Sequence, residues 1–368
     1  MATGDDVTLA LCGDVMLGRG IDQILPSPGD ARLYESYMDS ALGYVRLAEA
    51  AHGAMPRRVS FDYVWGDMLA DLEELRPQAR IANLETSITT SDTPVPKGIN
   101  YRMHPGNAGC LTAAAFDCCV LANNHVLDWD TEGLLETLST LEGARIRIAG
   151  AGRHVAEAAQ PATIIIAGNR RVLVFGYGST SSGIPRNWAA TEQSPGVNLL
   201  PDLSPATAER IANHVATLRR AGDLVVVSIH WGTNWGFQVT DEQRTFAHAL
   251  IDYGGCDLLH GHSSHHMRPI EVYRDRLILY GCGDFINDYE GISGYEEYRG
   301  DLTLMYLPRL SHDGAIGELT MVPYRIRRFQ LSRASRKDAA WLQTTLDRES
   351  MPFGCRVALG GDGRLTAR

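Results

Sequence analysis

Short apolar runs alternate with amphipathic segments over most of the chain. The run at residues 224–229 is apolar without alternation, as in strands that are buried on both faces. Similar runs rich in Val, Ile, Leu and Cys recur between the amphipathic segments. The predicted strands are residues 8–12, 81–84, 118–122, 146–149, 163–166, 172–175, 224–229 and 257–260.

The segments between these strands place apolar residues at helical spacing. Val64, Met68 and Leu72 follow this spacing within one such segment. Thr131 is predicted to be the N-cap of another helix, which ends just before Gly143. The predicted helices are residues 62–75, 131–141, 204–220 and 241–253.

Strands interleaved with helices predict a layered α/β architecture with a mixed sheet. Antiparallel pairing is expected near the end, where residues 270–273 and 277–280 predict a hairpin and residues 302–307 and 318–322 predict a closing pair. The long segments 26–54 and 179–201 are rich in Gly, Pro and Ser, and we expect them to be loops at the rim of a cleft.

The domain organisation predicted from this pattern is simple. No linker rich in Pro, Gly or Ser divides the chain, so we expect one catalytic domain over residues 7–326. The stretch from Leu331 onward has helical character, and residues 327–368 are predicted to be a C-terminal helical extension packed on the same domain.

Composition excludes several classes of protein. Hydrophobic residues make up 44% of the 368 positions and charged residues 21%, which rules out a disordered chain. The net charge of −10 argues against a nucleic-acid partner, because phosphate binding needs a basic face. The sequence predicts no membrane segment, and its polar start lacks the layout of a signal peptide, so we expect a cytoplasmic protein.

The seven cysteines indicate buried thiols rather than chemistry. Most of them lie inside apolar runs, including the adjacent Cys118 and Cys119, and no C-x-x-C pair occurs.

Ligand-type residues follow the apolar runs at five places along the chain, at residues 12–15, 82–85, 122–128, 229–232 and 258–265. In each, the run stops at Asp, Glu, Asn or His. One such cluster is weak evidence, since a turn Asp or a solvated Glu is common. Five together predict a metal site at the strand ends.

The carboxylate candidates are Asp14 and Glu85, with the amide oxygen of Asn83 as an alternative to Glu85 for bridging two metals. Asn123, Asn124 and His125 follow a buried strand and offer amide oxygens and an imidazole.

Asp128, three residues after His125, can fix the tautomer of that imidazole for proton transfer. The alternative interpretation of this cluster is a turn with a structural histidine.

Four histidines fall within residues 260–266. His262 and His265 are the predicted ligand pair, while His260 lies inside the strand and His266 behind the ligands. His230 ends the most apolar strand, where an imidazole needs a hydrogen bond or a ligand.

Carboxylate, amide and imidazole donors suit Mn²⁺, Fe or Zn²⁺. Six candidate ligands favour two ions over one, and a two-metal site can activate water against a phosphoester or an amide carbonyl. His125 would protonate the leaving group or stabilise developing charge.

The chain resembles the CapA family of capsule synthesis and poly-γ-glutamate biosynthesis proteins, a branch of the calcineurin-like metallophosphoesterases. The resemblance lies in G-D-V-M-L-G-R at 13–19, N-L-E at 83–85, L-A-N-N-H-V-L-D at 121–128, H-W-G at 230–232 and G-H-S-S-H at 261–265. It implies a four-layer α/β/β/α sandwich with mixed sheets and a dinuclear site.

The resemblance also implies roles for individual residues. His125, supported by Asp128, is the implied catalytic imidazole. The implied metal ligands are Asp14, Glu85, Asn124, His230, His262 and His265.

Some positions differ from the family pattern. Met16 stands where ordinary metallophosphoesterases have a histidine, and Asp284 in Gly-Asp-Phe adds a carboxylate near the site. Lys97, Arg102 and Arg19 are the candidates for binding an anionic group of the substrate, with an ordinary surface charge as the alternative for each.

Three functions are compatible with these residues. The first, which we favour, is a metal-dependent hydrolase acting on a phosphoester or on a γ-glutamyl-type amide. The second is an enzyme that forms or transfers an amide bond in the synthesis of poly-γ-glutamate or a peptide-like product. The third is a non-catalytic partner of an amide ligase. No phosphate-binding P-loop is present in the sequence, so ligase activity would need a partner or a pre-activated substrate.

Overall fold

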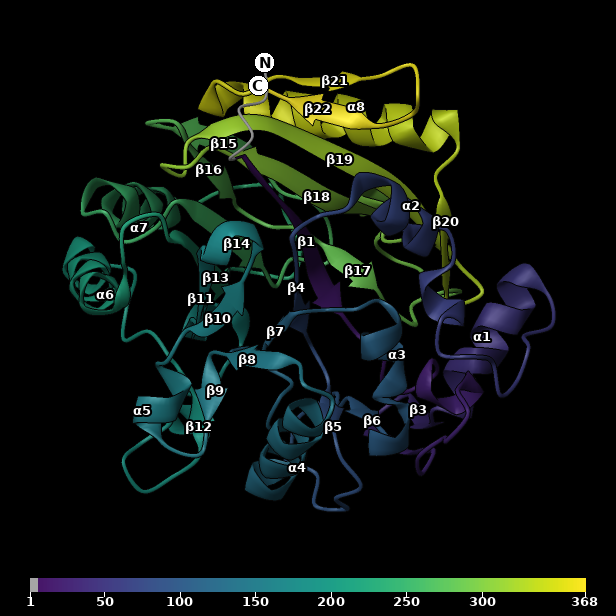
Figure 1. The fold of residues 1–368 in the computed structure, drawn as a ribbon. Helices are drawn as coiled ribbons and strands as arrows, with labels where there is room; N and C mark the ends of the chain where they lie inside the picture. Colours follow the sequence, from purple (N-terminus) through teal and green to yellow (C-terminus); the bar gives the residue numbers. More distant parts are fainter. Residues whose placement is uncertain (1–5) are drawn as a thin grey trace.

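Two large mixed β-sheets form the framework of the protein in the computed structural model, which describes residues 6–368 (Figure 1). One sheet has ten strands and the other has six. Each contains parallel and antiparallel neighbours, because helices connect some of the strands and short turns connect others. The chain is therefore a mixed α/β protein, and the prediction of mixed sheets is confirmed.

The ten-stranded sheet is built around β1 (Val7–Val15). This strand pairs parallel with β4 (Ala79–Leu84), antiparallel with β18 (Leu302–Leu310) and, at its end, parallel with β17 (Asp284–Ile286). Segments from both ends of the sequence thus meet on β1. The other strands of this sheet are β7 (Cys118–Val120), β8 (Arg147–Ala149), β19 (Ile316–Arg327), β20 (Gln330–Arg333), β21 (Val357–Leu359) and β22 (Leu365–Ala367).

The six-stranded sheet has a parallel centre formed by β11 (Arg171–Gly178), β13 (Leu224–His230) and β14 (Leu258–His262). All seven residues of β13 are buried, which explains why its sequence does not alternate. The outer strands are β10 (Ala162–Ile165), β15 (Ile270–Tyr273) and β16 (Arg276–Leu279), and β15 and β16 form the predicted hairpin.

Helices lie against the outer sides of this framework, with α6 and α7 beyond the six-stranded sheet (Figure 1). The helices are α1 (Leu42–His52), α2 (Met68–Leu75), α3 (Gly109–Ala113), α4 (Asp130–Gly143), α5 (Val155–Ala158), α6 (Pro205–Leu218), α7 (Asp241–Asp252) and α8 (Arg336–Ser350). Three two-stranded ribbons complete the fold: β2 (Arg32–Glu35) with β3 (Met38–Ser40), β5 (Ser87–Ile88) with β6 (Arg102–Met103), and β9 (Ala151–Gly152) with β12 (Gly196–Val197).

Three hydrophobic clusters hold these elements together. One contains Leu9 of β1 and Val226 of β13, so apolar side chains of the two sheets pack against each other. A second joins Leu134 of α4 to the large sheet. The third joins Val215 of α6 and Phe246 of α7 to the six-stranded sheet. Burial of these apolar faces is the main force that stabilises the arrangement.

Three of the four predicted helices begin within one residue of the predicted position, and the fourth does not. The helix predicted at residues 62–75 is interrupted at Gly66, where φ is 44° and a Cβ atom would lie 2.1 Å from the Leu331 carbonyl oxygen. The prediction of Thr131 as an N-cap is wrong, because α4 begins at Asp130 and Thr131 lies inside it. The Ser204 side chain does cap α6.

Two segments differ from their predicted character. Residues 26–54 were expected to be a loop, but they contain β2, β3 and α1. The C-terminal stretch contains the expected helix as α8, and it also contributes β21 and β22 to the edge of the large sheet. The division into residues 7–326 and 327–368 stays a prediction.

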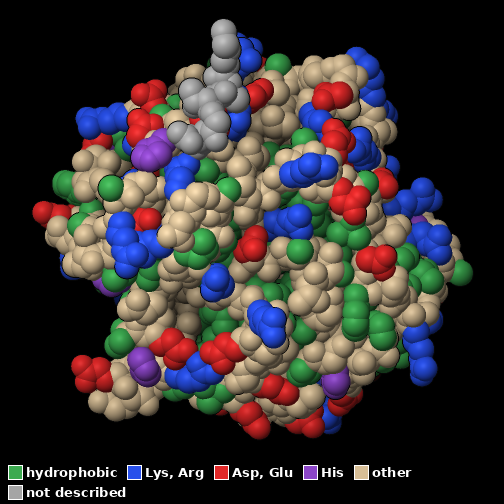
Figure 2. All heavy atoms as spheres, in the orientation of Figure 1, with side chains coloured by type: hydrophobic (Ala, Val, Ile, Leu, Met, Phe, Trp, Pro, Cys, Tyr) green, Lys and Arg blue, Asp and Glu red, His purple; other side chains and the backbone are tan. Residues whose placement is uncertain are grey.

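The cysteines, the helices and the surface charges can be compared with the expectations drawn from composition. All seven cysteines are buried and unpaired, as expected. Within residues 6–368 no helix is both long and apolar enough to cross a membrane. On the face in Figure 2, Lys and Arg side chains are interspersed with Asp and Glu and form no continuous basic patch.

Candidate metal centre

Strands of both sheets end at one place, and their last residues meet there. In the large sheet β1 carries Asp14, and β4 runs on to Glu85. In the other sheet His230 ends β13 directly opposite His262 at the end of β14. Parallel strands bring their carboxyl ends to the same edge, so residues distant in sequence converge. The structure thus brings four predicted ligands together.

Asp14, His230 and His262 form the tightest group. One ligand atom from each lies within 4.8 Å of the others, and all three side chains are buried. Nδ1 of His230 lies 2.8 Å from Nδ1 of His262, which in turn lies 3.8 Å from Oδ1 of Asp14. A carboxylate and two imidazole nitrogens facing a common point are donors that divalent transition metals prefer. This buried group could bind a metal ion.

The outer nitrogen of each histidine ring is held by a polar partner. Nε2 of His262 lies 2.9 Å from Oγ of Ser228, and Nε2 of His230 lies 2.9 Å from Oδ1 of Asn124. Such partners fix the orientation of metal-binding imidazoles. The predicted ligand Asn124 therefore meets the centre through His230.

Glu85 lies beside this group and faces two imidazoles. Its Oε2 is 3.9 Å from Nδ1 of His230, and its Oε1 is 3.8 Å from Nε2 of His125. The side-chain amide of Asn83 donates to Oδ1 of Asp14 at 2.7 Å and to Oε2 of Glu85 at 3.2 Å. The oxygen of Asn83 instead accepts from Asn123, so in this arrangement Glu85 rather than Asn83 turns an anionic oxygen toward the centre.

The ionised forms of Asp14 and Glu85 are unfavourable at this buried position without a neighbouring cation. Burial raises the pKa of Asp14 to about 7, and the carboxylate of Asp284 adds to this effect. Burial also raises the pKa of Glu85 well above its usual range, with Asp14 and Asp284 contributing. Buried carboxylates this close must share protons or a positive ion. The donor set therefore fits a divalent metal.

His265 lies next to the three-residue group but is bound to other partners. Its Nδ1 is 2.8 Å from Oδ1 of Asp284, and its Nε2 is 3.0 Å from the amide nitrogen of Asn234. Burial alone would lower the pKa of His265, but Asp284 outweighs it and raises the pKa. Asp284 stands opposite Asp14 in the pairing of β17 with β1, so this pair adjoins the centre.

His125 and Asp128 form the predicted hydrogen-bonded pair, with 2.7 Å between Nδ1 and Oδ2. Lys97 donates to Oδ1 of Asp128 at 2.7 Å, and the backbone N–H of Tyr101 donates to Oδ2 at 2.6 Å. The ring of Tyr101 also packs edge-on against the imidazole. These contacts hold the ring so that its Nε2 faces Glu85.

Burial lowers the pKa of His125 to about 4, although Asp128 opposes the shift. The imidazole is therefore neutral near pH 7, with its Nδ1–H donated to Asp128. Nε2 is left free to accept a proton from water or to exchange one with a leaving group.

Arg19 and Arg102, the other two predicted substrate-binding residues, interact with groups of the protein itself. Arg19 is buried, forms ion pairs with Asp288 and Glu35, and lies over the ring of Tyr44. Arg102 donates to the carbonyl oxygens of surrounding loops, and its guanidinium lies 3.9 Å from the ring centroid of Trp129. Their role in substrate binding stays a prediction.

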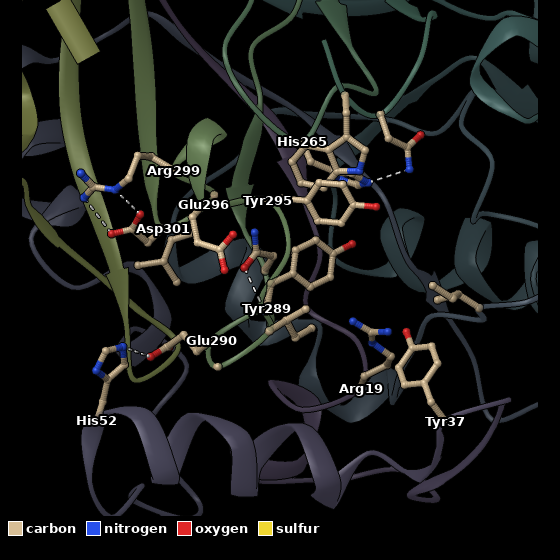
Figure 3. A pocket seen from close by; sticks show the side chains of 18 residues that line it. Arg19, Tyr37, His52, His265, Tyr289, Glu290, Tyr295, Glu296, Arg299 and Asp301 are labelled. Atoms are coloured by element: carbon tan, nitrogen blue, oxygen red, sulfur yellow. Dashed lines mark hydrogen bonds and ion pairs between the residues drawn. The ribbon is translucent and has the colours of Figure 1, made fainter. Parts of the chain in front are cut away.

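A cavity of about 560 Å³ opens beside the centre (Figure 3). His265, whose imidazole is held by Asn234, lines it at the top of Figure 3, and Arg19 and Tyr37 lie at the lower right. A molecule of modest size bound here would reach the edge of the centre.

Several residues of the site were not among the predicted ligands. Ser228 and Asn234 hold imidazoles, and Asn287 donates to Asp284 at 2.8 Å. A signal existed for Asp284, which follows a glycine after an apolar run. Ser228 is the one polar residue before His230 in β13, but the strand sequence alone does not show which side chain it bonds.

Residues 8–289 match the model of the family described as "Bacterial capsule synthesis protein PGA_cap". A probable polyglutamine synthesis accessory protein of Mycobacterium tuberculosis is 46% identical over 364 residues, which cover 98% of this chain and 96% of the relative.

Two further relatives are more distant. The PGA biosynthesis protein CapA of Bacillus subtilis is 26% identical over 368 residues, covering 98% of this chain and 82% of the relative. The capsule biosynthesis protein CapA of Bacillus anthracis is 23% identical over 327 residues, covering 88% of this chain and 68% of the relative.

Proposed function

The chain belongs to the PGA_cap family of bacterial capsule synthesis proteins, and on that premise we propose that it is a metal-dependent hydrolase that serves the synthesis of a glutamate or glutamine polymer. The observation that carries the proposal is the buried group of Asp14, His230 and His262. A passive scaffold gains nothing from such a group, because burying a carboxylate among neutral imidazoles costs folding stability.

The proposed reaction is hydrolysis of a γ-glutamyl-type amide or of a phosphoester. Asp14, His230 and His262, with Glu85 beside them, would hold a divalent metal, which would supply Lewis acidity for activating water. Two ions, drawn from Mn²⁺, Fe or Zn²⁺, are proposed because the carboxylate of Asp284, which pairs with His265, lies next to the first group.

The protein's own residues handle the proton in this proposal. Asp128 keeps the Nδ1–H of His125 engaged, so Nε2 is the atom that exchanges a proton with the leaving nitrogen or oxygen. Lys97 holds Asp128 through an ion pair and closes that side of the site. Its ammonium group lies near enough to the imidazole to favour anionic charge on the substrate.

Metal analysis of the purified protein, paired with a hydrolysis screen, tests the proposal. We expect bound Mn, Fe or Zn in the unmodified protein and its loss in His262→Gln, while His312→Gln, an exposed histidine, keeps it. With added Mn²⁺, either p-nitrophenyl phosphate or a γ-glutamyl anilide should be cleaved, and His125→Asn should slow cleavage by roughly 10²-fold or more. Retention of metal by His262→Gln would refute the assignment.

A second function has its own support. Both the mycobacterial and the Bacillus relatives are named for polymer or capsule synthesis rather than for hydrolysis. The same site would then polarise an acyl group during amide-bond formation or transfer, or the protein would act as partner of an amide ligase. Release of amine from a γ-glutamyl substrate without a second protein supports hydrolysis. Strict dependence on a co-purified ligase supports the alternative.

Two further features belong to this proposal. The four-layer α/β/β/α arrangement of a metallophosphoesterase is supported by the three clusters that lie between the sheets and on their outer sides. The division of the chain at residue 326 and the cytoplasmic location also stand as proposals.

A further inference from the structure

The cavity beside the metal centre has a definite chemical character. It is lined by aromatic rings and by charged groups, and His265 connects it to Asp284 at 2.8 Å and so to the centre. Trp235 lies 5.3 Å from His265 by ring centroids and stacks on Tyr295. A ligand in the cavity therefore lies against aromatic surface while one end reaches the metal-ligand candidates.

Both guanidinium groups that line the cavity are already neutralised. Arg19 pairs with Glu35 and Asp288, each buried. Arg299 pairs with Asp301 at 2.7 Å and with Asp338 at 2.8 Å. Arg19 thus meets two carboxylates, while Arg299 shares Asp301 and Asp338 with Arg325, so the carboxylates match or exceed the guanidinium charges. The histidine at the far side, His52, lies 3.2 Å from Glu290.

More carboxylates than guanidinium groups line the cavity. Glu290 lines it and is held by the backbone N–H groups of Arg328 and Phe329. Glu296 also lines it, accepts the backbone N–H of Gly294 at 3.0 Å, and points toward the middle of the space in Figure 3. The local potential is therefore negative, which disfavours a polyanion.

Aromatic rings supply the remaining wall. Tyr289 lines the cavity, and the exposed rings of Tyr37 and Tyr295 lie at its mouth. Ile292, 44% exposed, adds apolar surface to the same rim. Ring faces and carboxylates together attract organic cations, through charge and through the negative face of the ring.

We propose that this cavity binds the amine-bearing part of the substrate, an ammonium group carried on an apolar or planar body. The proposal rests on the hydrolase function above, and the ammonium is a group that the substrate carries apart from the scissile bond, because an amide nitrogen is uncharged before cleavage. The scissile bond would then lie toward Asp14 and His262, and the ammonium group toward Glu296. A polyanionic glutamate chain is not the occupant of this cavity.

Three probes of one shape and different charge test the proposal: benzylamine, benzyl alcohol and benzoate. Isothermal titration of the EDTA-treated protein keeps the metal from binding the carboxylate probe. We expect benzylamine to bind at least fivefold more tightly than benzyl alcohol, and benzoate to bind most weakly. Glu296→Gln should weaken benzylamine binding roughly threefold and leave benzyl alcohol unchanged. The neighbouring Glu297→Gln, which does not line the cavity, should change neither.

The proposal is overturned if benzoate binds as well as benzylamine, if benzylamine does not bind, or if Glu296→Gln has no selective effect. Metal analysis of the same protein before EDTA treatment separates this result from the fate of the proposed function. Selective amine binding by a protein that never holds metal would leave the cavity assigned and the hydrolase refuted. Metal-dependent cleavage without amine selectivity would support the hydrolase and refute the assignment of the cavity.

Discussion

Gly13 shows how one small residue determines the geometry of the centre. The backbone N–H of Asp14 donates to the carbonyl oxygen of Gly283 at 2.9 Å, so β1 and the turn before β17 lie in close contact. A Cβ atom on Gly13 would lie 1.8 Å from that same oxygen. The backbone on either side would have to move, and Asp14 and Asp284 would move with it.

Gly13→Ala should therefore lower the free energy of unfolding by more than about 2 kcal/mol, because the clash is with backbone rather than with a flexible side chain. Gly98→Ala is the matched control, since a Cβ atom there meets nothing within 4 Å. Urea denaturation of both variants beside the unmodified protein measures the difference. Equal stability of Gly13→Ala and Gly98→Ala would contradict the close packing described.

At the scale of elements, an ion pair joins the start of β11 to the turn before β13. Asp223 accepts from Nε of Arg171 at 2.9 Å and from the backbone N–H of Arg220 at 2.7 Å. Partial burial acts to raise the pKa of Asp223, but the hydrogen bonds outweigh it and the pKa lies below its usual range. The folded state therefore favours the ionised carboxylate.

This shift predicts how stability depends on pH. Because the folded pKa is depressed, the contribution of Asp223 is present above the unfolded pKa of about 4 and is lost as the pH falls below it. Asp223→Asn should be less stable than the unmodified protein by roughly 1 kcal/mol at pH 7. The difference should shrink toward zero at pH 3. Urea midpoints at the two pH values test this, and a difference independent of pH would exclude the ionic origin.

At the scale of the whole molecule, the candidate metal centre is expected to cost the metal-free protein stability. Buried carboxylates with raised pKa values oppose folding at neutral pH until a cation joins them. Metal binding to the folded state alone adds stability by mass action. The metal-free protein is thus expected to be the less stable form.

Adding metal at about 100 times its dissociation constant should stabilise the unmodified protein by about 2.7 kcal/mol. Asp14→Asn should abolish this gain and, in EDTA, be at least as stable as the unmodified protein, because it removes a desolvated charge. Thermal unfolding with EDTA and with Mn²⁺ measures both effects. A marked loss of stability by Asp14→Asn in EDTA would show that the carboxylate is paired by protein groups alone.

Most strands of the two sheets could be predicted from the sequence, because a buried strand is a run of apolar residues. Leu224–His230 is the clearest case, since burial on both faces removes alternation. The start of α2 was predicted less well, because Gly66 breaks a periodic segment through contact with Leu331, far away in the sequence. Local patterns cannot report such contacts.

The candidate site shows the same division. Strand-end residues such as Asp14 and His262 could be found because polar residues after apolar runs are conspicuous. Their partners could not: Ser228 points toward His262 because of the register of two strands, and the pairing of Arg19 with Asp288 depends on how loops return to the centre. The register of paired strands and the path of the loops are fixed only in the folded chain, so local sequence patterns do not predict these contacts.

The insertion of β17 beside β1 has a consequence for biogenesis. Ser263 donates its backbone N–H to Asp14 across 249 positions of sequence, and Asp284 comes later still. On the ribosome, a nascent chain contains all of these residues only after Asp284 has been translated, about three quarters of the way along the 368 residues. A product truncated before His262 would therefore lack part of the candidate metal-binding group.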